Sequence, residues 1–127
     1  SVNEIFKYGG EECFRDMETR LLEKLMNVQN SVIATGGGIV LREQNQVILQ
    51  KIGKRVYLKV PQAELLQRLK NDRKRLLLKE KNPESVLNKM FEERSLLYEQ
   101  AECIMDTGHQ SPQNIASEII RKLCNED

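Results

Sequence analysis

The apolar residues near the start of the chain recur at intervals of three and four. This spacing predicts an amphipathic helix from Glu11 to about Asn27. A shorter helix is expected before it, because Ser1-Val2-Asn3-Glu4 has the order of a capping box and Gly9-Gly10 is a typical helix end. The pattern therefore begins with two helices that are separated by a pair of glycines.

A short apolar run from Ser31 to Thr35 follows, rich in β-branched residues. A run that is apolar on both faces predicts a buried strand of a parallel sheet. It ends in Gly36, Gly37 and Gly38, and ligands of open α/β sheets bind beyond such strand ends. Residues without Cβ let the backbone approach a ligand and expose its N–H groups. The alternative is that these glycines form a plain loop.

The remaining pattern alternates helices with strands. Helices are predicted over Glu43–Ile52 (with Val47, Ile48 and Ile52 facing inward), from Pro61 to about Asn71, over Pro83–Gln100, and from Pro112 onward with Ser111 as N-cap; strands are predicted over Arg55–Val60 and Cys103–Thr107. Strands separated by helices imply right-handed crossovers and a three-layer α/β/α parallel sheet. The expected organisation is a single domain over residues 1–127.

The sequence pattern does not decide the role of two charged groups, which are a pair on one helix and a segment near the middle of the chain. Arg15 and Glu18 lie three residues apart on the predicted second helix, and on spacing alone they read as a solvated surface ion pair. Residues 72–82 begin with Asp72-Arg73-Lys74-Arg75 and continue with three leucines, without helical periodicity. Such a segment is either a mobile basic flap over an anion or a solvated surface loop.

Composition excludes several function classes. The 20 basic and 19 acidic residues give a net charge of +1, which argues against a dedicated nucleic-acid binder. No apolar run has the length of a membrane span. The three cysteines are widely spaced, which favours reduced thiols in a cytoplasmic protein. The single histidine, His109, makes a Ser–His–Asp triad or a histidine-rich metal centre improbable, so no metal-ligating residue is assigned.

Taken together, the motifs resemble those of the shikimate kinases, small P-loop kinases of aromatic amino-acid biosynthesis. The matching residues run in order along the whole chain: Ser1-Val2 with Glu4-Ile5-Phe6, Phe14-Arg15 with Glu18, Thr35-Gly36-Gly37-Gly38, Asp72-Arg73-Lys74-Arg75, Glu93-Arg94 with Leu97-Tyr98, and Asp106-Thr107 with Pro112. The resemblance implies a P-loop fold of the nucleoside-monophosphate-kinase type. It also implies that ATP, with Mg²⁺, phosphorylates the 3-hydroxyl of shikimate.

The resemblance assigns a shikimate-binding set. Arg15, supported by Glu18, and Arg94 would hold the shikimate carboxylate, which suits arginine because its planar fork pairs with both carboxylate oxygens. The backbone of Gly37 and Gly38 would meet the hydroxyl groups of shikimate, and Gly36 would lie near the metal and phosphates.

It also assigns a nucleotide-binding set. Arg68 would stack on the adenine with Pro112 on its other face, and Gln110 would lie near the nucleotide. Arg75 belongs to the family's closing lid, here residues 72–82, and would act as the catalytic residue by reaching the transferring phosphate. Its role would be electrostatic, because phosphoryl transfer is catalysed mainly by positioning and charge stabilisation.

The chain departs from the family pattern in two ways. Leu76 and Leu96 stand where the family usually has proline, which keeps apolar character but loses the fixed φ. In addition, no segment fits Gly-x-x-x-x-Gly-Lys-Ser/Thr, the phosphate-binding loop, and the strand that precedes this loop in the family is also without a counterpart. We therefore expect the carboxyl-terminal part of a shikimate kinase domain, inactive by itself and monomeric when complete.

Two other functions stay open. One is a different small-molecule P-loop kinase, such as a gluconate kinase-like protein, although paired Arg15 and Arg94 argue against a neutral sugar as acceptor. The other is a catalytically silent kinase-like domain that binds a small molecule or a partner. The missing phosphate loop favours the silent domain, whereas the retained Arg68, Arg75 and Arg94 argue against it.

Overall fold

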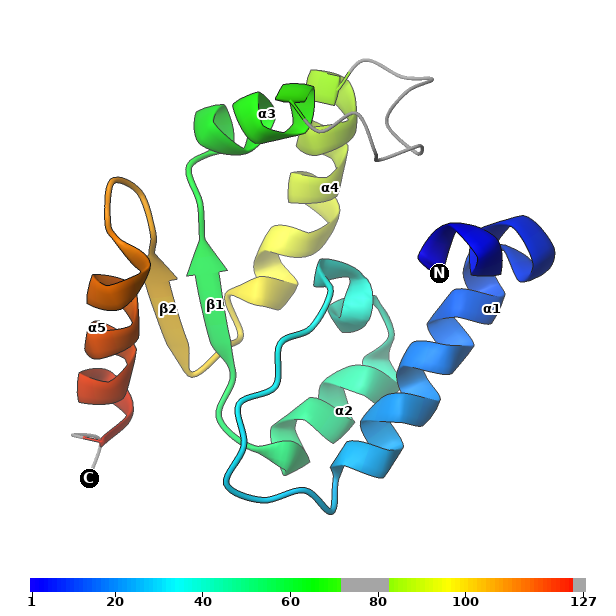
Figure 1. The fold of residues 1–127 in the computed structure, drawn as a ribbon, viewed down its shortest axis with the longest axis horizontal. Coiled ribbons are helices and arrows are strands. Elements are labelled where there is room, and N and C mark those ends of the chain that lie inside the picture. The colour runs from blue at the N-terminus through cyan, green and yellow to red at the C-terminus, as the bar shows by residue number, and fades with distance from the viewer. Residues whose placement is uncertain (72–82, 125–127) are drawn as a thin grey trace. The chain divides into compact units, whose positions relative to one another are not determined.

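The structure is a computed structural model, and it describes residues 1–71 and 83–124. Its elements are α1 (Val2–Leu25), the 3₁₀ helix η1 (Gly37–Leu41), α2 (Glu43–Ile52), β1 (Val56–Lys59), α3 (Gln62–Asn71), α4 (Pro83–Tyr98), β2 (Cys103–Asp106) and α5 (Pro112–Cys124) (Figure 1). They form two compact units, Ser1–Lys54 and Arg55–Asp127. Each unit is described by itself.

The first unit packs α2 and η1 against α1. A capping box begins α1: the Ser1 hydroxyl accepts a hydrogen bond from the backbone N–H of Glu4 at 3.2 Å, and the Glu4 carboxylate accepts one from the terminal amino group. Gly10 has a non-helical conformation with φ of 73°, so α1 consists of two helical segments joined at this residue. The predicted division at the glycine pair is confirmed.

The prediction of a buried strand over Ser31–Thr35 is wrong. This segment has no strand assignment, and the side chain of Val32 is fully exposed. A β-strand exists only through ladder hydrogen bonds to a neighbouring strand, and no described strand pairs with these residues. The apolar run therefore continues as an irregular connection that leads from α1 into η1, visible as the cyan trace in Figure 1.

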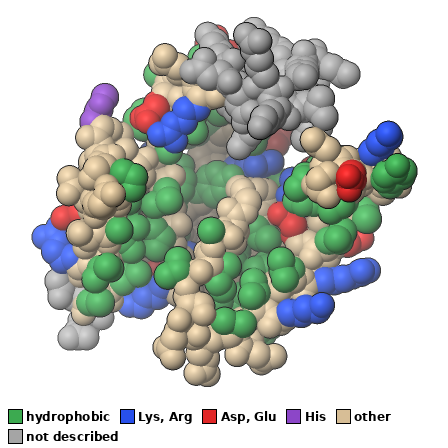
Figure 2. Space-filling view, in the orientation of Figure 1, with side chains coloured by type: hydrophobic (Ala, Val, Ile, Leu, Met, Phe, Trp, Pro, Cys, Tyr) green, Lys and Arg blue, Asp and Glu red, His purple; other side chains and the backbone are tan. Residues whose placement is uncertain are grey.

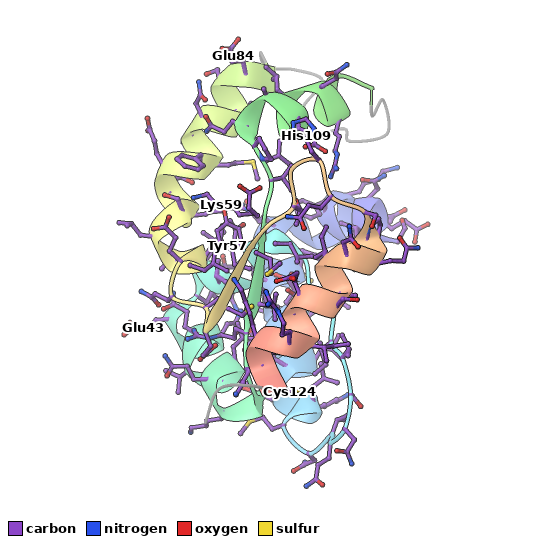
Figure 3. All side chains as sticks on the ribbon, turned by 90° about the vertical axis from the view of Figure 1, so that its left-hand side faces the viewer. Glu43, Tyr57, Lys59, Glu84, His109 and Cys124 are labelled. Atoms are coloured by element: carbon purple, nitrogen blue, oxygen red, sulfur yellow. The ribbon has the colours of Figure 1, made fainter. Side chains whose placement is uncertain are left out.

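The second unit is built on the parallel pair β1 and β2, which pair in register from Val56 with Cys103 to Lys59 with Asp106. Alternate residues face opposite sides of this sheet. Tyr57 and Lys59 lie on one side, where Figure 3 shows them directed toward α4. Cys103 and Met105 point to the other side and are buried. The predicted parallel arrangement of these two strands is confirmed.

The helices of the second unit follow the predicted ranges to within one or two residues at each end. α3 packs against α4, and α5 packs against β2. Ser111 is the N-cap of α5, because its hydroxyl oxygen accepts a hydrogen bond from the N–H of Asn114 at 3.1 Å. The lid that the sequence predicts, residues 72–82 with Arg75 and Leu76, lies outside the described residues.

Large apolar side chains are exposed on both units, as the space-filling view in Figure 2 shows for one face. Leu96, one of the two residues that replace a family proline, is 74% exposed. Its side chain therefore contributes little to packing. Among the described residues, no helix is long and apolar enough to cross a membrane.

An ion pair fastens the start of β1 to the turn that precedes β2. The backbone N–H of Arg55 donates to Glu102 Oε2 at 2.8 Å, and its guanidinium donates to both oxygens of the same carboxylate. A further bond runs from Arg55 Nη2 to the carbonyl of Gln100 at 2.8 Å. Hydrogen bonds from the Arg55 side chain hold the pKa of the Glu102 carboxyl below its usual value.

This pair predicts a pH-dependent contribution to stability. Because the pKa of Glu102 is lowered in the folded state, the stabilisation is present above the unfolded value of 4.5 and is lost as the pH falls through the folded value. We expect Glu102→Gln to lower the free energy of unfolding by about 0.5 kcal/mol at neutral pH, the scale of a half-exposed ion pair, and to have no effect well below pH 4.

Urea denaturation of the wild type and the variant at several pH values measures this difference. Glu92→Gln, which removes an exposed carboxylate from α4, is the matched control. An equal loss of stability at neutral and acidic pH would show that Glu102 acts by packing and not by charge.

Candidate functional site

The side chain of Arg15 forms the centre of the candidate site in the first unit. It extends from α1, and its Nη1 donates to Glu18 Oε1 at 2.6 Å. Only 15% of the Arg15 side chain and 13% of the Glu18 side chain are exposed. The solvated surface pair that spacing alone indicates is therefore wrong. A charge pair with this little exposure is costly unless further hydrogen bonds satisfy its polar groups.

The glycine segment lies directly against this pair. A Cβ atom on Gly38 would be 2.4 Å from Arg15 Nη1 and 2.6 Å from its Cζ, so the backbone reaches the guanidinium only because no side chain is present. A Cβ on Gly36 would lie 3.7 Å from Glu18 Oε2, which is ordinary van der Waals contact. Gly37 begins η1 between them. The structure thus brings together Arg15, Glu18 and the predicted glycines, and the plain-loop alternative does not account for this close approach.

The Arg15 guanidinium has hydrogen-bond donors that its side-chain partners do not use. Its Nη2 forms a longer contact of 3.4 Å with Glu11 Oε1, and its Cζ lies 5.2 Å from the centre of the Phe14 ring. Its Nε is buried and has no hydrogen-bond partner among the described residues. A guanidinium carries five N–H groups in one plane, and this one can therefore accept a planar anion as an additional partner.

Arg94, the second predicted anion ligand, is on α4 in the other unit and is half-buried. Its Nε is buried, again without a hydrogen-bond partner in the described part of the chain. The end of α4, one helical turn after Arg94, packs against β1. There the rings of Tyr57 and Tyr98 lie 5.0 Å apart, and Lys59 forms an ion pair with Glu99 at 3.8 Å. Burial in this contact raises the pKa of the Tyr57 hydroxyl.

The predicted nucleotide ligands all belong to the second unit. Arg68 is exposed on α3 and pairs with Glu64, one turn earlier, at 2.6 Å. Gln110 lies in the turn between β2 and α5, and its Nε2 donates to the carbonyl of Asp106 at 2.7 Å. Pro112 is the exposed first residue of α5. An open hollow of about 550 Å³ runs along α5 beside Asp106 and Gln110.

Hydrogen bonds stabilise the turn that carries Gln110. The Asp106 carboxylate accepts the N–H of Gly108 at 2.9 Å, and the Thr107 N–H donates to the carbonyl of Lys59 at 2.9 Å. His109, labelled at the tip of this turn in Figure 3, adopts a left-handed φ of 58°. The polar side chains at the end of β2 therefore shape the turn that leads into α5.

The catalytic candidate Arg75 lies outside the described residues, together with the rest of the predicted lid. Within the described part of the chain, no three His, Cys, Asp or Glu side chains gather as a metal site. The described residues therefore do not fit a protein-built metal cage.

Sequence reasoning missed several residues around the Arg15 site. Glu11 and Phe14 contact the Arg15 guanidinium, and the spacing of Glu11 and Arg15, four residues on one helix, could have indicated the first contact. Thr19 and Asn45 form a buried hydrogen bond of 2.8 Å beneath the site. Asn45 gives no signal in a sequence pattern, because a polar residue in a first helical turn is usually solvated.

Comparisons with known proteins show which family the chain resembles. The family model for shikimate kinase matches residues 1–124. A curated shikimate kinase of Xylella fastidiosa strain M12 is 40% identical over 97% of this chain, and one of Nitrosospira multiformis is 37% identical over 97%. A solved structure described as shikimate kinase from Acinetobacter baumannii in complex with shikimate superimposes with a TM-score of 0.90 at 34% identity over 99% of the chain.

The lengths of these proteins differ from that of the chain. It spans 69% of the Xylella protein, 64% of the Nitrosospira protein and 72% of the Acinetobacter structure. The predicted P-loop kinase fold is confirmed by these structural neighbours. The described sheet itself contains only the parallel pair β1 and β2. The chain belongs to the shikimate kinase family, whose members transfer a phosphoryl group from ATP to shikimate.

Proposed function

We propose that this chain supplies the acceptor site of an ATP-dependent shikimate kinase, with Arg15 as the anchor of the shikimate carboxylate. The half-buried Arg15–Glu18 pair against the backbone of Gly38 is the observation that carries the proposal. Glu18 fixes one edge of the guanidinium, and the remaining N–H groups of Arg15 take the two carboxylate oxygens of the substrate.

Arg94 is proposed as the second carboxylate ligand. Its buried Nε has no hydrogen-bond partner among the described residues, which supports a ligand as the partner of this donor. The structure described as a shikimate complex, with its TM-score of 0.90, supports the same type of ligand.

The backbone of Gly37 and Gly38 would then meet the hydroxyl groups of the bound ring. In the reaction, the 3-hydroxyl oxygen of shikimate forms a bond to the γ-phosphorus of ATP. The bond between that phosphorus and the β,γ-bridging oxygen breaks, ADP leaves, and the hydroxyl proton is lost. Such a transfer depends on in-line positioning, which the fixed carboxylate supplies at the acceptor side.

The nucleotide side of the site is proposed from the second unit. Arg68 and Pro112 would enclose the adenine, Gln110 would lie beside the nucleotide, and Arg75 would stabilise charge on the transferring phosphoryl group. Gly36 would lie toward the phosphates. Mg²⁺ would arrive coordinated by the ATP phosphates, as it usually does in kinases. Cytoplasmic location and a monomeric state of the complete protein stay predictions from the sequence.

The alternative functions make different demands on the site. The paired Arg15 and Arg94 exclude only a neutral sugar, because gluconate itself carries a carboxylate. A gluconate kinase-like activity is therefore tested by direct comparison of the two acceptors. A catalytically silent domain would bind shikimate without transferring phosphate. Assay of ADP release from the full-length protein with shikimate, with gluconate and with neither acceptor separates the three functions. Release that depends on shikimate alone supports the proposal, and release with gluconate alone would refute it.

A change of the Arg15 side chain tests the proposed carboxylate anchor. Arg15→Lys keeps the positive charge but loses the planar fork, so we expect the KM for shikimate in the full-length protein to rise roughly tenfold or more, with the KM for ATP unchanged. Arg20→Lys, on the exposed side of the same helix, is the matched control. An equal rise of both KM values in the Arg15 variant would contradict a role confined to shikimate.

Gly38, the glycine that lies against the Arg15 guanidinium, can be tested in the same way. In Gly38→Ala the new Cβ would displace the guanidinium of Arg15, which is the flexible end of a long side chain. We therefore expect the thermal midpoint to stay close to that of the wild type while shikimate binding weakens roughly tenfold, the scale of a lost charged hydrogen bond.

Titration calorimetry with shikimate and thermal denaturation measure the two quantities. Gly53→Ala is the control, because a Cβ at Gly53 meets nothing within 4 Å. Unchanged shikimate affinity in Gly38→Ala would show that the close contact with Arg15 has no part in binding.

A further inference from the structure

The side chain of Asn45 is fully buried, with 0% exposure, in the first turn of α2. Its Oδ1 accepts a hydrogen bond from the Thr19 hydroxyl of α1 at 2.8 Å. Its Nδ2 donates to the backbone carbonyl of Ile39 in η1 at 3.0 Å. A single side chain therefore connects α1 with the 3₁₀ helix that carries the glycines.

The two ends of this connection are adjacent to the acceptor site. Thr19 is one helical turn after Arg15, and its hydroxyl also lies 3.1 Å from the Arg15 carbonyl oxygen. Ile39 directly follows Gly38. A Cβ on Gly38 would overlap the guanidinium, so the backbone of η1 lies close to Arg15 and a shift of η1 relative to α1 would change this contact.

Only an amide satisfies both ends at once. In the reversed orientation the Oδ1 atom would face the carbonyl oxygen of Ile39, and two acceptors would meet. Arg42 fixes the hydroxyl further: its Nη1 lies 3.3 Å from Thr19 Oγ1 and 2.9 Å from Asp16 Oδ1. The Thr19 hydroxyl can thus accept from Arg42 and donate to Asn45.

We propose that Asn45, through Thr19, is a positioning residue for shikimate: it sets the distance between the Arg15 guanidinium and the Gly37–Gly38 backbone. This inference rests on the proposed function, because that distance matters only if the substrate carboxylate and hydroxyl groups bind at the two sides. Asn45 itself does not touch the substrate.

Two variants test the connection from its two ends in the full-length protein. Asn45→Asp keeps the size but replaces the donor to the Ile39 carbonyl with an acceptor. Thr19→Val keeps the shape but removes the hydroxyl. For both variants we expect the KM for shikimate to rise roughly tenfold, because a misplacement of a substrate contact by about 1 Å or less has an effect of this order. The KM for ATP should stay within about twofold of the wild type.

Two further variants separate positioning from stability. Thr19→Ser restores the hydroxyl and should restore the KM for shikimate. Gln46→Met is the matched control, because Gln46 Nε2 donates to the Val40 carbonyl of η1 at 2.8 Å and, among the described residues, forms no hydrogen bond to α1. This variant should leave the KM for shikimate within about twofold of the wild type, which is the usual scatter for a substitution that does not touch the site.

The experiment distinguishes a failure of the positioning role from a failure of the proposed function. If the wild type does not phosphorylate shikimate, the proposed function fails and this inference fails with it. If the wild type is active and Thr19→Val folds with an unchanged KM for shikimate, only the positioning role is overturned. An equal rise in both KM values, or a failure of Thr19→Ser to restore the shikimate value, also overturns it. Thr19→Val decides the question if Asn45→Asp does not fold.

Discussion

The close approach of the Gly38 backbone to the Arg15 guanidinium is the constraint on which the acceptor site depends. A Cβ at this glycine would be 2.4 Å from Arg15 Nη1, a distance that would force the guanidinium to move. The glycine therefore creates the space for the arginine, and Glu18 holds the arginine in that space at 2.6 Å. The partly buried charge pair lies where an anionic ligand would complete its hydrogen bonding.

The rest of the first unit maintains this approach. The helical segment after Gly10 presents Arg15, Glu18 and Thr19 along one side of α1, because residues three and four apart lie on the same face of a helix. Asn45 joins that side to η1 from within the unit. A buried amide with both of its hydrogen bonds satisfied specifies one arrangement of the two elements, since any shift leaves a polar group unpaired.

Much of this could be predicted from the sequence. The capping box at Ser1, the break at Gly10 and the ranges of α2, α4 and α5 follow from local chemistry, and the structure confirms them. Arg15 with Glu18 and the glycines were assigned by family resemblance, and the structure brings them together. Spacing alone gave the opposite answer for the ion pair, because periodicity does not show which side of a helix the glycine segment will cover.

The failures have a common physical origin. The predicted strand over Ser31–Thr35 lacks a described partner, and strand formation is a property of pairs and not of single segments. On α2, Val47 was expected to face inward but is 46% exposed, while Asn45 is buried. Apolar periodicity cannot identify a polar residue that is buried because two other elements satisfy it. The roles of Arg68, Arg75, Gln110 and Pro112 stay predictions.

The most direct test of the account compares the binding of shikimate with that of its neutral methyl ester by titration calorimetry on the full-length protein. The two ligands share the ring and all hydroxyl groups and differ in the charge of the carboxyl group. If Arg15 and Arg94 anchor a carboxylate, the ester should bind roughly a hundredfold more weakly, the scale of one or two lost charged hydrogen bonds. Equal affinity for the two ligands would contradict the account.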